Sequence, residues 1–312
     1  MSSLRLTNVC MVEPAAFGFN AETAATNRFQ HPAAGTAHEV AVAARREFAA
    51  LAATLRSADI GVAVAADSAE PPKPDALFPN NWVSFHADGS VVLYPMHSPV
   101  RRAERREAVI DAAKTQLGFV ERRRIDLTAE EQRGRFLEGT GSLVLDHAAR
   151  VAYACRSPRT DESLMREWSR LMDYEPFLFD AATPDGTPVY HTNVVLWIGA
   201  RIAGAGLAWI PATQRDALQA RLRRGGREVL PLSGEQLHSF AGNMLELEDG
   251  AGRRKLVMSA AAAHSLNKAQ QQRLQEAGMQ PVICAIPTIE AVGGGSVRCM
   301  LAEVPVVTGS VP

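Results

Sequence analysis

The chain has 312 residues, 46% of them hydrophobic and 21% charged, and its formal net charge is -1. A chain of this size and apolar content can bury a large core. Its near-neutral balance lacks the electrostatic field that favours nucleic acid or a membrane surface, so we expect neither as a partner. The basic residues that do cluster are interpreted as a solvated helix face with its adjoining loop: Arg101, Arg102, Arg105, Arg106, Arg122, Arg123 and Arg124.

The four cysteines, Cys10, Cys155, Cys284 and Cys299, are far apart in the sequence. No pair has the spacing of a zinc or redox site, so we expect no metal and no cofactor. The first three lie in apolar, strand-like runs, where buried free thiols are usual. Residues 1–6 lack the apolar region of a secretory signal, and no apolar run approaches the roughly 20 residues of a membrane span. We therefore expect a cytoplasmic protein with reduced thiols.

Five stretches have the apolar periodicity of helices, and glycines follow most of them. They are residues 37–57, closed by Gly61; 103–117; 161–172, with Asp161 as the cap; 212–224; and 265–277, closed by Gly278. No linker rich in proline or serine divides the chain. We therefore predict a single domain over residues 1–312.

Between these helices, polar or glycine-containing turns precede alternating apolar strands. The turns recur at residues 81, 139, 193, 243 and 296, so successive turns are 50 to 58 residues apart. The strands predicted after them are 82–85, 142–145, 194–198, 244–247 and 298–301. Five repeats of strands plus one helix predict a closed α/β arrangement. Such a ring would bring the turn tips together at its centre: Asn81, Glu138, His191, Asn243 and Cys299.

Residues 293–299 carry the clearest chemical signal, because a run of glycines leads to a single cysteine. Glycine lets a substrate approach the backbone closely, and a thiolate is a strong nucleophile. Among the eight histidines, His191 lies at a repeat turn and could supply the base, although a buried structural histidine is the alternative. Glu138 is the only carboxylate at a repeat turn. Alone it would be an exposed turn acid; with Cys299 and His191 it is the natural third member of a triad.

Four segments, three of which contain these residues, resemble motifs of the guanidino-group-modifying enzyme superfamily, which has the pentein fold. They are residues 136–139, 155–160, 191–193 and 294–300, and the order Glu, His, Cys also agrees. Residues 11–14, 27–30 and 78–82, with Asn20, further resemble the arginine-deiminase-related group known as citrulline-utilisation hydrolases, which are amidinotransferase-like. The resemblance spans nearly the whole chain. It implies an α/β-propeller with five-fold pseudosymmetry.

The resemblance also implies a role for each residue. Cys299 would attack the central carbon of a guanidino or ureido group, and His191 would shuttle protons to the leaving amine and from the hydrolytic water. Glu138 would hold His191 and one substrate nitrogen. Arg159 would bind the α-carboxylate of an amino-acid substrate, since a guanidinium matches a carboxylate bidentately, although a surface arginine at a helix start is the alternative. Further substrate-binding candidates are Asn80, Asn81, Asn193 and Arg298; self-association into a homo-oligomer is left open.

The chain departs from arginine deiminases at three places. Their Phe-x-x-Asp and His-x-Asp turns become Phe-x-x-Asn at Asn81 and His-x-Asn at Asn193, and Glu-Gly-Gly-Asp becomes residues 138–141 without the second acid. Asparagine offers both donors and an acceptor, which suits a neutral ureido group. We therefore expect citrulline to be hydrolysed to ornithine, ammonia and carbon dioxide.

Four alternatives stay open. The enzyme could be an arginine dihydrolase that passes through citrulline, an arginine deiminase, or an amidinotransferase that uses an amine acceptor. It could also be a binding protein that has lost the chemistry, although the retained triad argues against that. Residues 14–36 are predicted to form a lid.

Overall fold

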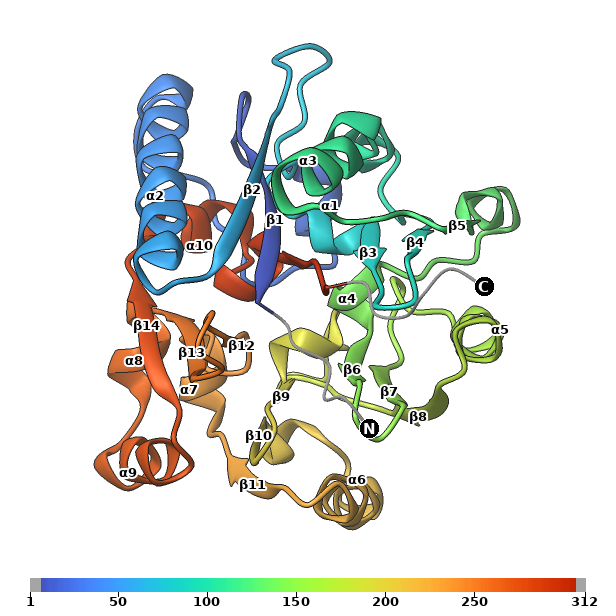
Figure 1. Ribbon diagram of the computed structural model, residues 1–312, viewed down its shortest axis with the longest axis vertical. Helices are drawn as coiled ribbons and strands as arrows, with labels where there is room; N and C mark the ends of the chain where they lie inside the picture. Colours follow the sequence, from blue (N-terminus) through green and yellow to red (C-terminus); the bar gives the residue numbers. More distant parts are fainter. Residues whose placement is uncertain (1–6, 307–312) are drawn as a thin grey trace.

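Five three-stranded sheets stand around a common centre in the computed structural model, which describes residues 7–306 (Figure 1). Residues 1–6 and 307–312 lie outside the described residues. The prediction that residues 1–6 lack the apolar region of a secretory signal therefore concerns residues that the structure does not describe. In every sheet the middle strand pairs antiparallel with the inner strand and parallel with the outer one. The sheets are β15-β1-β2 (Ala302–Glu303, Asn8–Glu13, Gly61–Ala66), β3-β4-β5 (Val83–Phe85, Ser90–Leu93, Arg123–Asp126), β6-β7-β8 (Val144–Asp146, Val151–Cys155, Glu175–Phe179), β9-β10-β11 (Leu196–Ile198, Ile202–Ala205, Glu228–Pro231) and β12-β13-β14 (Leu245–Glu248, Arg254–Ser259, Gln280–Cys284).

The first and the last strand share one sheet and so close the ring. Strand β15 pairs antiparallel with β1, with Val9 opposite Glu303. This pairing carries the segment just before β15, which contains Cys299, to the centre. The repeat arrangement predicted from the turn spacing is confirmed by the five equivalent sheets.

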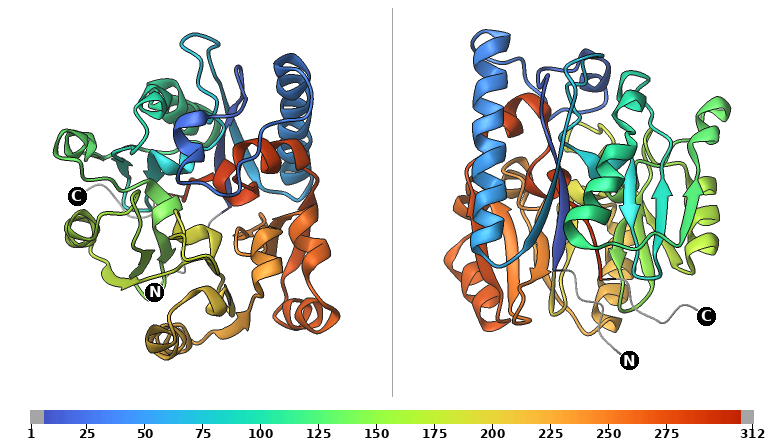
Figure 2. Two further views of the ribbon diagram at one scale, coloured as in Figure 1. Left: turned by 180° about the vertical axis from the view of Figure 1, so that it is seen from behind. Right: turned by 45° about the horizontal axis from the view of Figure 1, so that its top comes forward.

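Helices cover the outside of the ring, because each parallel strand pair needs a crossover (Figure 2). The crossover helices are α2 (Ala37–Ser57), α3 (Glu107–Leu117), α5 (Glu162–Met172), α6 (Ala212–Arg224) and the pair α8 (Ala260–Ser265) and α9 (Lys268–Glu276).

Local sequence explains where these helices begin and end. Asp161 caps α5 by accepting a hydrogen bond from the backbone N–H of Leu164 at 2.8 Å. The predicted helix over 103–117 starts later, at Glu107. The predicted helix over 265–277 is interrupted, because Asn267 forms a new capping box with Gln270.

Short helical turns, rather than strands, form the tips that point to the centre. The tips are the 3₁₀ turns Pro79–Asn81, Thr192–Val194 and Val297–Met300, the single turn α4 (Gly139–Ser142), and the turn that follows α7 (Gly234–His238). The prediction that Cys299 lies in a strand is therefore wrong. Its N–H donates to the carbonyl of Ser296 at 3.0 Å, and the strand begins only at Ala302.

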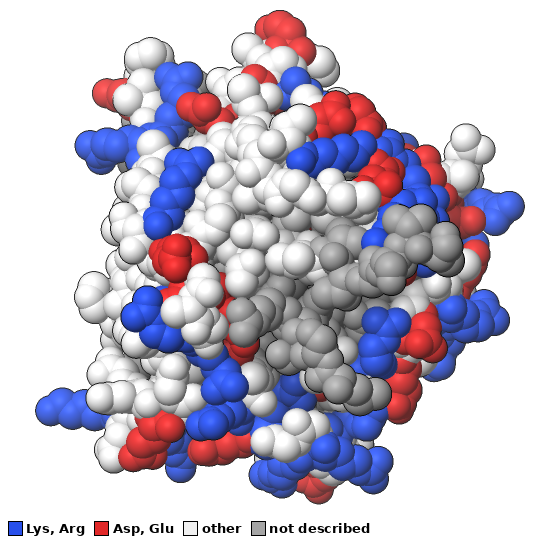
Figure 3. All heavy atoms as spheres, viewed as in Figure 1, with Lys and Arg blue, Asp and Glu red and all other residues white. Residues whose placement is uncertain are grey.

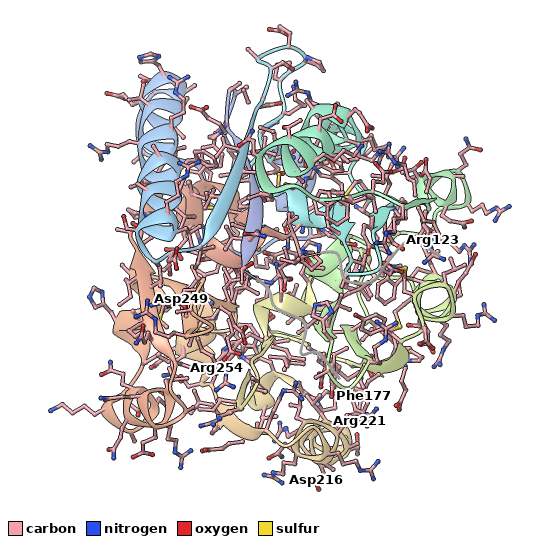
Figure 4. All side chains as sticks on the ribbon, in the orientation of Figure 1. Arg123, Phe177, Asp216, Arg221, Asp249 and Arg254 are labelled. Atoms are coloured by element: carbon pink, nitrogen blue, oxygen red, sulfur yellow. The ribbon has the colours of Figure 1, made fainter. Side chains whose placement is uncertain are left out.

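The arginine cluster is not uniformly solvated. On the face in Figure 3, basic and acidic side chains alternate around the rim, and Arg123, Asp216 and Arg221 lie at the periphery (Figure 4). Arg124 pairs with surface glutamates. Arg101, by contrast, is 2% exposed and lies inside the ring, so its interpretation as a solvated residue is wrong.

Cys10, Cys155 and Cys284 are buried free thiols, as predicted. Within residues 7–306, none of the helices is long and apolar enough to span a bilayer.

Candidate active site

The turn tips enclose a small central cavity of about 10 Å³. A space of this size holds about one water molecule. Its walls come from four of the five repeats and from the segment after β1. The lining residues are Thr23, Asn27, Asp75, Phe78, Asn81, Arg101, Arg159, Tyr190, His191, Gly293, Gly294, Gly295 and Cys299.

Cys299 reaches this cavity through helix α10 (Pro287–Gly293) and the glycine run that follows it. Gly294 ends the helix with a φ of +61°, and a Cβ there would lie 2.6 Å from both the Asn27 amide nitrogen and the Gln30 side chain. Only glycine fits both the backbone conformation and the space. The 4% exposure of Cys299 limits solvent at the sulfur.

His191 and Glu138 form a buried hydrogen-bonded pair. The Nε2 atom of His191 lies 2.8 Å from Oε2 of Glu138, and both side chains are at most 2% exposed. Burial opposes ionisation of Glu138, but Arg159, His191 and Arg101 outweigh it and hold its pKa well below the usual range. Burial lowers the pKa of His191 to about 4, against the influence of Glu138.

At neutral pH the imidazole is therefore neutral and the carboxylate is charged. The carboxylate can only accept, so Nε2 carries the proton and Nδ1 has the free lone pair of a base. A Cβ at Gly141 would lie 2.7 Å from Nδ1, so the glycine leaves the room that the ring needs.

Two asparagines contact the sulfur of Cys299. Its Sγ lies 3.3 Å from Nδ2 of Asn243 and 3.6 Å from Nδ2 of Asn193. Burial raises the pKa of the Cys299 thiol, and these two amides act in the opposite direction. The structure thus brings together the five turn-tip residues, since Asn81 also lines this cavity.

Asn81 has a fixed orientation because of Arg101. Nη1 of Arg101 donates to Oδ1 of Asn81 at 2.9 Å, and Nδ2 of Asn81 donates to Oδ1 of Asn80 at 3.0 Å. The rest of the Arg101 guanidinium is bound bidentately by Glu104 at 2.8 and 2.9 Å. Burial raises the pKa of Glu104 to about 7, although Arg101 lowers it.

Arg159 lies in the cavity wall, where its guanidinium contacts the predicted lid. Both Nε and Nη2 donate to the single hydroxyl oxygen of Thr26, at 3.1 and 2.7 Å. Nη2 also donates to the Thr23 carbonyl at 3.2 Å, and the guanidinium lies 4.9 Å from the ring centroid of Tyr190. The bidentate side of the guanidinium therefore faces a hydroxyl that a carboxylate could replace.

Asp75 is a buried carboxylate that the sequence reasoning missed. Oδ2 accepts from Nδ2 of Asn20 at 2.7 Å and lies 3.7 Å from Nε of Arg101. Oδ1 has no hydrogen-bond partner among the described residues. A buried oxygen of this kind, next to a cavity, can accept from a ligand.

Residues 14–36, the predicted lid, cover one side of the cavity, where Thr23 and Asn27 line it. Helix α1 (Ala21–Ala24) is capped by Asn20, and Glu22 accepts from the Ser98 hydroxyl at 2.6 Å. Asn27 donates to the Gly294 carbonyl at 3.2 Å.

Two predicted substrate ligands do not reach the cavity. Arg298 donates to the Leu301 carbonyl at 3.0 Å and to Glu303 at 2.7 Å, away from the cavity wall, so its assignment is corrected. Successive residues of a 3₁₀ turn point about 120° apart, which separates Arg298 from Cys299. Asn80 is fully buried and contacts Asn81 rather than the cavity.

Residues 7–306 contain no group of three or more His, Cys, Asp or Glu side chains that could hold a metal ion.

Solved structures with the same fold include two kinds of enzyme. One is the N-terminal domain of ArgZ, an arginine dihydrolase from the ornithine–ammonia cycle in cyanobacteria, which was solved bound to its substrate. Its sequence is 16% identical to this chain and its TM-score is 0.72, and the match covers 96% of this chain and 98% of that one. DDAH from Pseudomonas aeruginosa, complexed with citrulline, is 13% identical with a TM-score of 0.66, over 96% and 99% of the two chains. In the longer apo ArgZ structure, which is 16% identical with a TM-score of 0.72, the match covers 98% of this chain and 41% of that one.

A comparison with curated proteins finds no match. A model of the family described as N,N dimethylarginine dimethylhydrolase, eukaryotic, matches residues 13–306. The match covers nearly the whole chain and includes Glu138, His191 and Cys299. The chain therefore belongs to this family, within the pentein superfamily of guanidino-modifying enzymes.

Proposed function

We propose that this protein is a cysteine-dependent C–N hydrolase whose substrate is citrulline, which it converts to ornithine, ammonia and carbon dioxide. The observation that carries the choice of substrate is the fixed amide of Asn81. Its oxygen accepts from Arg101 and one of its N–H groups donates to Asn80, so the remaining N–H group is what it can offer a ligand. A ureido oxygen can accept from this N–H group, whereas a guanidinium has only donors.

The formal charges around the cavity nearly cancel, because Arg101 and Arg159 are accompanied by the carboxylates of Asp75, Glu104 and Glu138, all buried or nearly so. The neutral ureido end of citrulline adds no further charge to this poorly solvated site. The choice between citrulline and arginine therefore rests on the Asn81 amide.

The other end of the substrate would be held as a zwitterion. Arg159 would bind the α-carboxylate bidentately, in place of the Thr26 hydroxyl. The free Oδ1 of Asp75 would accept from the α-ammonium group. Thr23 lies between these two side chains, since it contacts Arg159 through its carbonyl and Asp75 through its hydroxyl.

The reaction follows from the proton positions. Nδ1 of His191 takes the proton of the Cys299 thiol, and the sulfur attacks the ureido carbon. A C–N bond breaks as the C–S bond forms, and His191 returns the proton to the leaving nitrogen. Water, deprotonated by His191, then breaks the C–S bond. The resulting carbamate loses carbon dioxide, so one citrulline and one water give ornithine, ammonia and carbon dioxide.

A second candidate is an arginine dihydrolase that passes through citrulline. The fold likeness to ArgZ, with a TM-score of 0.72, favours it. In that reaction a first hydrolysis would release ammonia and leave citrulline bound to the enzyme, and a second would proceed as above.

Incubation with citrulline, arginine, agmatine and methylated arginines tests the proposal. We expect ornithine and ammonia from citrulline, with a higher kcat/KM than for any guanidinium substrate. Ornithine from arginine, with two ammonia per ornithine and a higher kcat/KM, would favour the dihydrolase. Conversion of arginine that stops at citrulline would refute the asparagine argument.

A further inference from the structure

We propose that Asn243 is a positioning residue that stabilises the thiolate form of Cys299. This inference rests on the proposed nucleophilic role of Cys299. Asn243 comes from the fourth repeat, does not line the cavity, and contacts the reacting atom from the protein side.

The orientation of the Asn243 amide is determined by a neighbouring carbonyl. Nδ2 of Asn243 donates to the backbone oxygen of Asn193 at 2.9 Å. A carbonyl oxygen only accepts, so the nitrogen must face it. The same nitrogen lies 3.3 Å from Sγ of Cys299 and directs its second N–H group toward the sulfur.

The Asn243 amide can form a hydrogen bond with Cys299 in both protonation states of the sulfur. Oδ1 of Asn243 lies 3.5 Å from Sγ, within reach of an S–H donor, whereas Nδ2 faces a sulfur that accepts. A thiol sulfur is a weak acceptor and a thiolate is a strong one. The N–H contact therefore strengthens when the proton leaves, which favours the nucleophile over the resting thiol.

The surrounding backbone holds the amide in place. The N–H of Asn243 donates to the carbonyl of Phe240 at 2.8 Å, and Phe240 has a φ of +60°, which is uncommon for a residue other than glycine. A Cβ at Gly242 would lie 1.9 Å from the Val194 carbonyl, so the two turns are in direct backbone contact. With an exposure of 1%, Asn243 is shielded from the bulk solvent that would compete for its donors.

Burial raises the pKa of Cys299, and among the groups that lower it the Asn243 hydrogen bond is the largest. Other titratable groups lie around the same sulfur and would stay unchanged in Asn243 variants. Those that face it or lie on the elements packed around it are Asp75, Arg101, Glu138, Arg159, Tyr190, His191, Glu290 and Arg298.

The test is the pH dependence of Cys299 alkylation by iodoacetamide, which requires no substrate. Asn243→Ala should move the midpoint of the alkylation curve up by about one to two pH units, since hydrogen bonds to charged groups are of that strength. Asn243→Asp preserves the shape and turns a carboxylate oxygen toward the sulfur, so its midpoint should rise at least as far. In steady-state kinetics Asn243→Ala should lower kcat at neutral pH, recover it at high pH, and leave KM nearly unchanged.

Two controls separate this role from a structural one. Cys299→Ser identifies the part of the alkylation that belongs to Cys299, because it leaves Cys10, Cys155 and Cys284 in place. Asn267→Ala removes an amide that caps α9, outside the cavity wall, and should lower stability without moving the midpoint. If the two folded variants, Asn243→Ala and Asn243→Asp, change the maximal alkylation rate but leave the midpoint of the pH curve where it is in the native enzyme, the proposal is overturned. If the midpoint moves but citrulline is not hydrolysed, the proposed substrate is wrong and the role of Asn243 stands.

Discussion

Replacing Asn81 by aspartate should turn the enzyme toward guanidinium substrates. The new carboxylate would keep its contact with Nη1 of Arg101, which is 2.9 Å from Oδ1 in the native protein. Its second oxygen would face Oδ1 of Asn80, an acceptor, but the Asn80 amide can rotate because its Nδ2 has no partner among the described residues. The substitution should therefore be tolerated by the fold.

The size of the effect follows from Coulomb attraction. Two opposite charges 4 Å apart interact by about 4 kcal/mol at an effective dielectric constant of 20. Arg101 already takes part of the new charge, so we expect about 3 kcal/mol in favour of a guanidinium over a ureido group. This corresponds to a roughly hundredfold change in the ratio of kcat/KM for arginine to that for citrulline.

The ratio is measured from initial rates of ammonia release, with citrulline and ornithine quantified by chromatography. Asn267→Asp is the matched control, because aspartate also caps helices and this position is not in the cavity wall. A ratio for Asn81→Asp equal to that of the unsubstituted enzyme would show that residue 81 does not select between a ureido and a guanidinium group. The single variant is cleaner than a double one with Asn193→Asp, since Asn193 also contacts the Cys299 sulfur.

Three further predictions concern the lid, the substrate carboxylate and acid stability. Arg159→Lys should raise the KM for citrulline by roughly tenfold to a hundredfold with a smaller loss of kcat, because an ammonium group cannot bind a carboxylate bidentately. An unchanged KM in steady-state kinetics would show that Arg159 does not bind the substrate carboxylate. Thr26→Val removes the hydroxyl that accepts hydrogen bonds from the Arg159 guanidinium, so it should lower the KM for citrulline. A raised KM would show that Thr26 does not compete with the substrate for Arg159. Burial lowers the pKa of His191 to about 4 and that of His86 to about 3, from 6.5, so below pH 6.5 the unfolded chain binds protons at both side chains that the native one does not. Glu104, whose pKa burial raises to about 7, acts in the opposite direction, but this one carboxyl group offsets only part of the effect of two histidines. The free energy of unfolding in urea should therefore fall as pH decreases from 7 to 4, and a flat profile would contradict these buried neutral imidazoles.

Local sequence was enough to predict the elements whose causes are local. Helix α5 is an example, because the Asp161 cap and the buried side chains of Leu164, Met165 and Trp168 lie within two turns of each other. The convergence of Glu138, His191 and Cys299 could also be predicted, because the regular spacing of the turns implies a ring. The resemblance to penteins then gave these residues their roles.

The residues that were misjudged depend on contacts distant in sequence. Arg101 belongs to an arginine-rich stretch, and only the folded chain buries it between Asn81, Glu104 and Glu138. Asp75 lies among prolines without periodicity; its only signal was its position shortly before the motif that contains Asn81. Arg298 is next to Cys299 in the chain, yet the 3₁₀ turn directs it to Glu303.

The attack of Cys299 on the ureido carbon of citrulline is the step on which the proposed function depends. It is tested most directly by a time course with citrulline alone, in which ornithine and ammonia are quantified for the native enzyme and for Cys299→Ala. We predict that the two products appear in a one-to-one ratio and that the variant forms neither. Product formation by Cys299→Ala at the native rate, or no ornithine from the native enzyme, would contradict the claim.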